Sequence, residues 1–234
     1  NEEWEGKLLL HRLWHNIRFA GAEGLPDRVR VEVRETLAPH KLEAVCETAL
    51  VYEVFADRIE LTASVRSDRR DLPFLPRFGV CAELCPELTQ VEYFGFGPRE
   101  NESDFVEGVR KGLYACRTAE LLPAYAKPQE GGMRSGVERF LLTDDQARLG
   151  FEVLALDRPL NATAYLFGRE KFEAMRHQKD VRPDGRVQLC VDGFRSGVGS
   201  QSCGHPPLEA YRFRLKEDWQ RFRFAMRIRP LDSE

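Results

Sequence analysis

The chain has 234 residues, of which 42% are hydrophobic, and a formal net charge of −3. This is enough apolar material for a core without disulfide or metal staples, in one large all-β domain or two ordinary ones. The 35 basic residues are interspersed among 38 acidic ones, so no broad positive field attracts nucleic acid. No apolar run approaches the roughly 20 residues that a membrane-spanning helix needs. We therefore expect neither a nucleic-acid nor a membrane partner.

Alternating apolar and polar residues predict β-strands along most of the chain. Residues 28–35, RVRVEVRE, place three valines on one face and charged side chains on the other, which is typical of a half-buried antiparallel strand. Residues 50–56 and 59–65 predict a hairpin that turns at Asp57-Arg58. Further strands are predicted at 78–84, 90–96, 136–142, 150–155, 161–167, 186–191, 210–215 and 222–228. This spacing is typical of a sandwich or barrel.

Other patterns complete the prediction. Short helices are expected at 170–178 and at 105–113. The strand at 222–228 alternates aromatic or Met residues with Arg, which favours a position at a sheet edge. Two segments rich in Gly and Pro, 127–136 and 193–207, predict long loops with a functional role.

The six cysteines are scattered through a chain that needs no disulfide framework. This favours reduced thiols and a cytoplasmic location. Cys81 and Cys85 are four residues apart, without a second pair at zinc-finger spacing, so we predict plain buried thiols and no zinc site.

Three segments resemble one known family. Phe94–Asp104 reads FGFGPRENESD, Gln129–Arg134 reads QEGGMR, and Val191–Gly199 reads VDGFRSGVG, followed by Ser202-Cys203-Gly204. Their order and spacing resemble the C-terminal small-chain domain of β-galactosidases in glycoside hydrolase family 2. The resemblance covers roughly residues 77–215, and the first quarter of the chain matches only loosely.

The resemblance implies an all-β fold, a large antiparallel β-sandwich of the supersandwich, galactose mutarotase-like type. We expect a single domain over residues 1–234, truncated at its N-terminal edge. In this family the two reactive carboxylates belong to a (β/α)₈ barrel, which takes about 250 residues of alternating strand and helix. This chain has neither that length nor that alternation, so we predict no catalytic carboxylate pair in it. The expected partners are that barrel, on another domain or chain, and a galactoside; whether copies assemble into a homo-oligomer is open.

The resemblance also implies candidate sugar-site residues. Cys203 falls where well-known members place a Trp against the sugar, and a thiol lacks the broad aromatic face of an indole. We expect Cys203 to contact the sugar, His205 to offer a hydrogen bond, and Arg134 to order its loop through its planar fork. Gly132 lies in the same loop, and Gly131 stands where the family usually has Asn. No cofactor is expected in this chain, and Mg²⁺ or Na⁺ would be held by other parts of the full enzyme.

Two other functions remain open at the level of sequence. An aldose 1-epimerase-like enzyme would need His177 or His205 to face a carboxylate across a cleft. A purely structural interaction domain would bury one face against its partners and would show an exposed apolar patch when alone.

Overall fold

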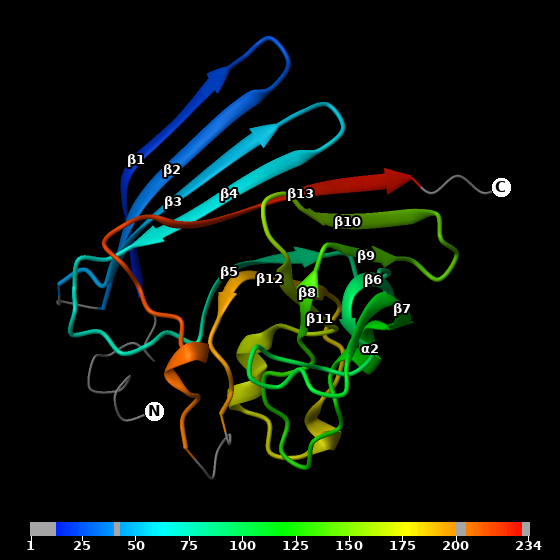
Figure 1. Ribbon diagram of the computed structural model, residues 1–234. Helices are drawn as coiled ribbons and strands as arrows, with labels where there is room; N and C mark the ends of the chain where they lie inside the picture. The colour runs from blue at the N-terminus through cyan, green and yellow to red at the C-terminus, as the bar shows by residue number, and fades with distance from the viewer. Residues whose placement is uncertain (1–12, 40–42, 200–204, 231–234) are drawn as a thin grey trace.

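The computed structural model describes residues 13–39, 43–199 and 205–230. Two antiparallel sheets lie one above the other (Figure 1). The larger sheet has nine strands in the order β1 (Trp14–Gly24), β2 (Val29–Ala38), β3 (Cys46–Val54), β4 (Ile59–Arg66), β13 (Gln220–Pro230), β10 (Leu149–Ala155), β9 (Arg139–Thr143), β6 (Gln90–Gly97) and β7 (Arg110–Arg117). The smaller sheet has four strands in the order β5 (Arg77–Leu84), β12 (Val187–Arg195), β11 (Leu160–Tyr165) and β8 (Arg134–Val137). The prediction of an all-β antiparallel sandwich is confirmed.

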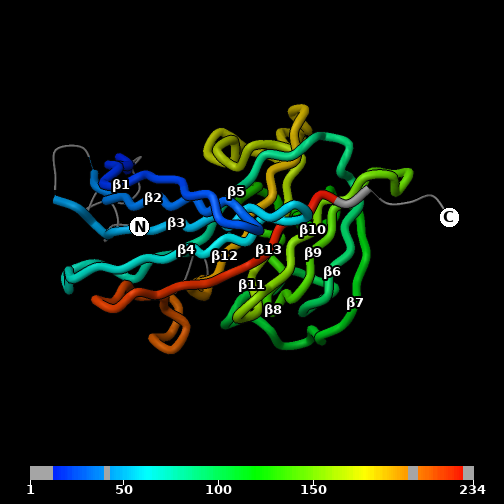
Figure 2. The backbone as a smooth tube through the Cα atoms, turned by 90° about the horizontal axis from the view of Figure 1, so that it is seen from above, coloured from blue at the N-terminus to red at the C-terminus, as the bar shows by residue number. Residues whose placement is uncertain are grey.

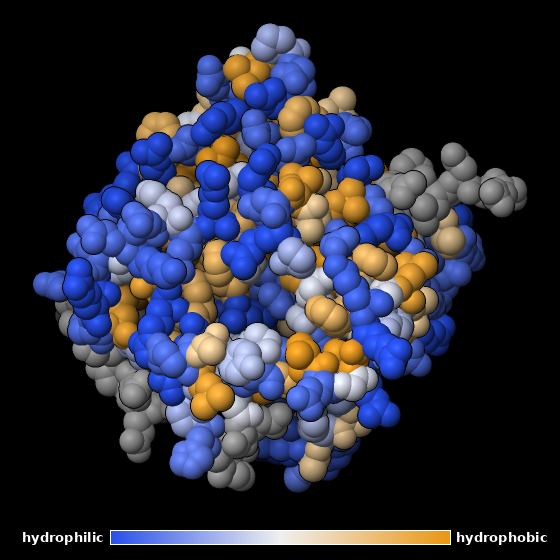
Figure 3. All heavy atoms as spheres, in the orientation of Figure 1, coloured by the Kyte–Doolittle hydropathy of each residue, from blue (hydrophilic) through white to orange (hydrophobic). Residues whose placement is uncertain are grey.

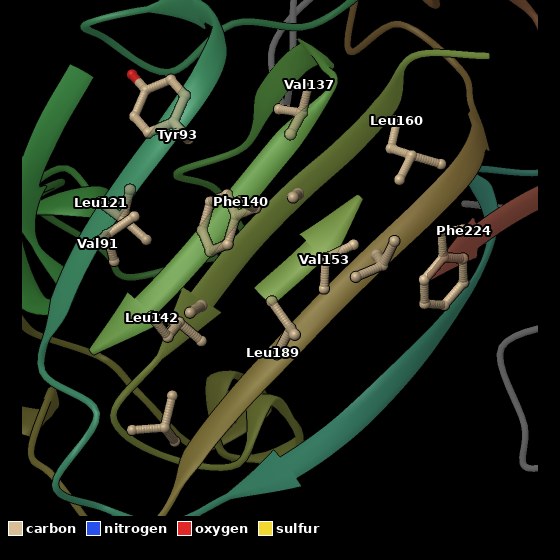
Figure 4. Packing of buried hydrophobic residues seen from close by; sticks show 14 of the residues in the cluster. Val91, Tyr93, Leu121, Val137, Phe140, Leu142, Val153, Leu160, Leu189 and Phe224 are labelled. Carbon is tan, nitrogen blue, oxygen red and sulfur yellow. The ribbon is translucent and has the colours of Figure 1, made fainter. Parts of the chain in front are cut away.

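The main core fills the space between the sheets. Alternate residues of each strand point to the same face, and the inner faces contribute large apolar side chains. Phe140 and Phe222 are completely buried there, and the Phe222 ring meets Phe78 of the smaller sheet edge to face at 5.7 Å. Figure 4 shows β6, β9, β10 and β13 packing against β8, β11 and β12 in this cluster.

The outer face of the large sheet carries a network of ion pairs. On β13, Arg223 lies 3.3 Å from Glu60 of β4, and Arg227 lies 3.8 Å from Glu152 of β10. Arg139 of β9 contacts the same Glu152 at 2.7 Å. The arginines of β13 therefore mark the outer face of an interior strand, and the prediction of an edge strand is wrong. Alternation identifies the two faces of a strand but carries no information on its neighbours.

Part of the large sheet extends beyond the smaller one. Figure 1 shows β1 to β4 projecting past β5, and Figure 2 shows these strands and the pair β6 and β7 on opposite sides of β13. Directly paired residues share a face, so the register places Val29, Val54 and Ile59 in line with Met226 and the buried Val153. Yet Val29 is 45% and Val54 is 37% exposed. An apolar stretch of the inner face is thus uncovered.

Several element predictions need correction. Residues 136–142 form no single strand, because the chain leaves β8 in one sheet at Val137 and enters β9 in the other at Arg139. Residues 210–215 contain a 3-10 turn, Glu209–Tyr211, and one isolated bridge from Phe213 to Leu75 in place of a strand.

The predicted helices are also largely wrong. Residues 105–113 lead into β7, and 170–178 hold only a 3-10 helix, Arg169–Glu173, followed by a second one, Gln178–Asp180. A short α-helix, α2 (Thr118–Leu121), was not predicted. Both predicted loops are shorter than expected, because β8 begins at Arg134 and β12 continues to Arg195. Within the described ranges, no helix has the length and apolar character needed to cross a membrane.

Candidate functional site

Three segments meet beside the smaller sheet, and they are the ones that carry the family resemblance. We call them the acidic segment (residues 99–104), the glycine loop (127–133) and the proline loop (196–207). The last is described at 196–199 and 205–207 only. Side chains of the acidic segment contact both loops, so this segment connects the glycine loop to the proline loop.

The acidic segment binds the glycine loop through a carboxylate and the following strand β8 through a side-chain amide. Glu100 accepts a hydrogen bond from the Gly132 backbone N–H at 2.6 Å. Asn101 is completely buried: its side-chain NH₂ donates to the carbonyls of Phe96 and Arg99, and its Oδ1 accepts from the Ser135 N–H at 3.0 Å. A buried amide with all these partners fixes the backbone on both sides of it.

Arg134 supports the glycine loop from beneath. Its side chain lies in the interior, where the residue is only 3% exposed. Nε donates to the Tyr93 hydroxyl at 3.0 Å, and Nη1 donates to the Gly132 carbonyl at 2.9 Å. The guanidinium thus holds backbone of the loop rather than presenting itself to solvent, and its predicted role in ordering this loop at a sugar site stays a prediction.

Gly132 has a conformation that other residues rarely adopt. Its φ is +74°, in the left-handed region, and a Cβ at this position would lie 2.5 Å from the Leu121 carbonyl oxygen. Its own carbonyl accepts from the Thr163 hydroxyl at 3.0 Å, and that of Gly131 accepts from Tyr165 at 2.7 Å. Gly132 therefore lets the loop approach α2 closely, and its role towards a sugar is untested.

The side chain of Asp104 binds the backbone at the start of the proline loop. Its carboxylate accepts from the N–H groups of Val198 at 3.0 Å and Gly199 at 2.8 Å. A Cβ on Gly199 would lie 2.5 Å from the His205 carbonyl oxygen, so the backbones of Gly199 and His205 lie close together. His205 itself is exposed. The predicted sugar contact Cys203 lies outside the described residues.

Replacing Asp104 by Ala is expected to loosen the base of the proline loop. Two backbone N–H groups lose their acceptor, at about 1 kcal/mol or more each, so amide exchange at Val198 and Gly199 should accelerate about tenfold. Hydrogen exchange measured by NMR checks this. Asp144→Ala is a matched control, because Asp144 accepts from Arg148 and Leu149 in the β9–β10 hairpin and its loss should leave the proline loop protected. Unchanged exchange in Asp104→Ala would contradict the anchoring role.

A buried ion network, which sequence reasoning missed, lies under the three segments. Arg195 forms a bidentate ion pair with Glu102 of the acidic segment, in which Nε and Nη2 donate to the two carboxylate oxygens at 2.9 and 2.6 Å. Its Nη1 donates to Asp192 at 2.9 Å. Arg77 of β5 lies 3.7 Å from Asp192 and pairs with Glu130 of the glycine loop. The network thereby connects two strands of the small sheet to two of the three segments.

The burial of these charges has electrostatic consequences. Asp192 is completely buried and Glu102 is 7% exposed. Burial raises the pKa of Glu102, while the adjacent Arg195 acts to lower it. Asp192 Oδ1 has no hydrogen-bond partner among the described residues and fills the space that a Cβ on Gly79 would need, at 1.9 Å. Both carboxylates are enclosed by arginines, which is unlike the open acid pair of a retaining glycosidase.

The histidines do not join this network. His177 precedes the 3-10 helix Gln178–Asp180, where its backbone N–H donates to Asp180. Over the part of the chain that is described, the one His–carboxylate ion pair joins His15 to Glu35 across β1 and β2. The pairing that an epimerase-like site requires is therefore not seen at the three segments.

Comparison with known proteins identifies the family. The model of the β-galactosidase small chain matches residues 3–228, and the chain belongs to this family. The β-galactosidase of Actinobacillus pleuropneumoniae is 29% identical over 176 residues, which cover 75% of this chain and 16% of that protein. That of Oenococcus oeni is 23% identical over 225 residues, covering 95% and 21%. The chain therefore spans about a fifth or less of the length of these relatives.

Solved structures with a similar chain path are also known. A putative aldose 1-epimerase from Escherichia coli gives a TM-score of 0.48 at 11% identity, covering 91% of this chain and 69% of that one. A galactose mutarotase-like protein from Lactobacillus casei gives 0.47 at 8% identity, covering 90% and 73%. Scores at this level mark a partial likeness that carries no information on activity.

Proposed function

We propose that the chain is the part of a β-galactosidase that walls and orients a terminal β-galactoside, while carboxylates on a barrel in another domain or chain cleave the bond. The observation that carries this proposal is the joining of the three family-like segments by Glu100, Glu102 and Asp104. Such fixed loops hold a ligand-facing edge in one geometry before the sugar arrives, which lowers the ordering cost of binding.

In this proposal the proline loop makes the direct contacts. Cys203 contacts the apolar side of the sugar and His205 offers a hydrogen bond. Asp104 supports this proposal because it binds the backbone of Val198 and Gly199 just before these residues, and Gly199 lies against the His205 carbonyl. Arg134 and Gly132 act one layer further in, since both lie against backbone of the glycine loop. A thiol gives a smaller contact area than an aromatic ring, so this platform would hold the sugar loosely.

The uncovered inner face of β1 to β4 supports the proposed partner. Val29 and Val54 are exposed there although they continue the row of buried core residues, and β1 adds Ile17, which pairs with Glu35 on the same face and is 64% exposed. Apolar surface of this kind commonly marks an interface. On the face shown in Figure 3, hydrophobic residues are interspersed with hydrophilic ones. We propose that the inner face of β1 to β4 packs against the catalytic part of the same enzyme.

The environment and ion requirements are part of the same proposal. The described cysteines Cys46, Cys81, Cys85, Cys116 and Cys190 are all free thiols, which supports a reducing, cytoplasmic location. Any Mg²⁺ or Na⁺ is assigned to the rest of the enzyme.

The chain alone is expected to hydrolyse no nitrophenyl galactoside, because the acids beside its loops are enclosed by Arg77 and Arg195. A spectrophotometric assay of the purified chain checks this, and substantial release of nitrophenol by a homogeneous sample would overturn the division of labour. Polarimetry on fresh galactose is the companion measurement. Accelerated mutarotation that is lost in His177→Ala or His205→Ala would favour the epimerase-like alternative.

A further inference from the structure

Two cysteines face each other across strands of the smaller sheet. Cys81 of β5 pairs in register with Cys190 of β12, and their sulfur atoms lie 3.2 Å apart. Cys190 is completely buried, whereas Cys81 is exposed. The prediction that all the cysteines are plain buried thiols is therefore wrong for Cys81, and also for the exposed Cys85.

This register suits a covalent bond between the two sulfurs. Directly opposed residues of antiparallel strands have Cα atoms about 4.5–5.5 Å apart, and disulfides accept Cα separations of about 4.4–6.8 Å. Little backbone movement is needed to bring the two thiols from contact to bonding distance.

A positive charge lies beside the exposed thiol. Arg77 Nη2 is 3.5 Å from Cys81 Sγ, and Asp192 on the neighbouring strand is the nearby opposing charge. The hydrogen bond between the two sulfurs, followed by the charge of Arg77, lowers the pKa of Cys81 to about 7, against the effects of burial and of Asp192. The same sulfur contact and burial raise the pKa of Cys190. Of the two thiols, Cys81 is therefore the one that ionises more readily, and Cys190 is the one that retains its proton.

We propose that Cys81 and Cys190 form a peroxide-sensitive dithiol that closes into an intrachain disulfide. The Cys81 thiolate attacks one peroxide oxygen, the O–O bond breaks, and the leaving hydroxide takes a proton to become water. The resulting Cys81 sulfenic acid is then attacked by the Cys190 sulfur, the S–O bond breaks, and the hydroxyl leaves with the Cys190 proton as a second water. Two thiols lose two electrons in total, and one hydrogen peroxide is reduced to two waters.

Cys85 provides an internal comparison. It is exposed like Cys81, but burial and Glu87 raise the pKa of its thiol, and no described cysteine lies within hydrogen-bonding distance of it. A lower pKa raises the thiolate fraction more than it weakens the nucleophile. Near neutral pH, Cys81 should therefore react with peroxide about fivefold or more faster than Cys85.

The test treats the purified protein with hydrogen peroxide, alkylates the remaining thiols and maps the peptides by mass spectrometry. We expect a Cys81–Cys190 crosslinked peptide that disappears after dithiothreitol. In Cys190→Ser the sulfenic acid at Cys81 should persist and be trapped by dimedone. Cys85→Ser should form the crosslink at the wild-type rate.

The wild-type map decides the question even where a variant folds poorly. If Cys81 and Cys190 both remain free to alkylation while Cys85 is oxidised at a similar or higher rate, the proposal is wrong. Crosslinks between molecules through Cys81, without the intrachain product, would also overturn it, because they would show that Cys190 does not reach the oxidised sulfur.

Discussion

Replacing Arg195 by Met is expected to lower the free energy of unfolding by about 3–5 kcal/mol, the range for removing one partner from a buried ion pair. Arg195 is the side chain that contacts Glu102 through both carboxylate oxygens and Asp192 through one. Without it, the carboxylate of Glu102 loses its described arginine partner in a region where it is 7% exposed. Asp192 keeps only the more distant Arg77, at 3.7 Å.

Urea unfolding followed by far-ultraviolet circular dichroism measures this change. Arg34→Met is the matched control, because Arg34 pairs with Glu32 at 2.6 Å but its side chain is 62% exposed. Loss of such a surface pair costs about 1 kcal/mol or less. Equal midpoints for the two variants would show that the Arg195 network contributes no more than a surface ion pair.

The same variant has a pH dependence of predictable sign. Burial already raises the pKa of Glu102, and Arg195 acts to lower it, so the Met substitution raises that pKa further. A carboxyl whose pKa is higher in the folded than in the unfolded protein stabilises the folded state when it is protonated. This stabilisation is complete below the unfolded-state pKa of about 4.3. It is lost as the pH rises through the folded-state pKa. The destabilisation should therefore be smaller at about pH 5 than at about pH 8. A deficit that is constant across this interval would exclude Glu102 as the group left uncompensated.

The second large effect is expected at Gly132. Replacing it by Ala should lower the free energy of unfolding by about 2–5 kcal/mol, from about 1–2 for the left-handed conformation and about 1–3 for the forced close contact. The new methyl group would lie 2.5 Å from the Leu121 carbonyl oxygen, which is backbone and cannot rotate away. The hydrogen bond from the Gly132 N–H to Glu100 should be lost as the loop shifts.

Gly108→Ala separates the two causes in this second experiment. Gly108 also has a positive φ, +83°, but a Cβ there meets nothing within 4 Å. Its substitution should cost only the conformational part, about 1–2 kcal/mol. If the two Ala variants unfold at the same urea concentration, the close packing of the glycine loop on α2 is not a source of stability.

The sequence allows most strands to be predicted, and the exceptions have physical reasons. Strands β2, β4 and β13 are found from clean alternation, because one face is apolar and the other carries paired charges. β1 was missed because it has a register shift between Ile17 and Phe19 and contains Gly and Ala in place of a regular apolar row. Strand 136–142 was predicted as one element because its apolar residues continue across Glu138, where the chain changes sheets.

The candidate site was located through its loops, while its internal contacts were not predictable. The segments around Asn101, Arg134 and Asp192 are predictable as site segments because they resemble those of a known family. The ion pair of Arg195 with Glu102 joins residues 93 positions apart, and nothing in the local pattern distinguishes these charges from the many surface charges. Likewise, spacing along the chain gives no sign that Cys81 and Cys190 lie opposite each other.

The most direct test of the account is complementation. The chain is mixed with the catalytic part of a β-galactosidase whose small-chain region has been removed, and hydrolysis of nitrophenyl galactoside is measured. We predict that neither component is active alone, that the mixture is active, and that Asp104→Ala reduces this activity through the proline loop it anchors. A mixture no more active than the catalytic part alone, or hydrolysis by this chain without a partner, would contradict the account.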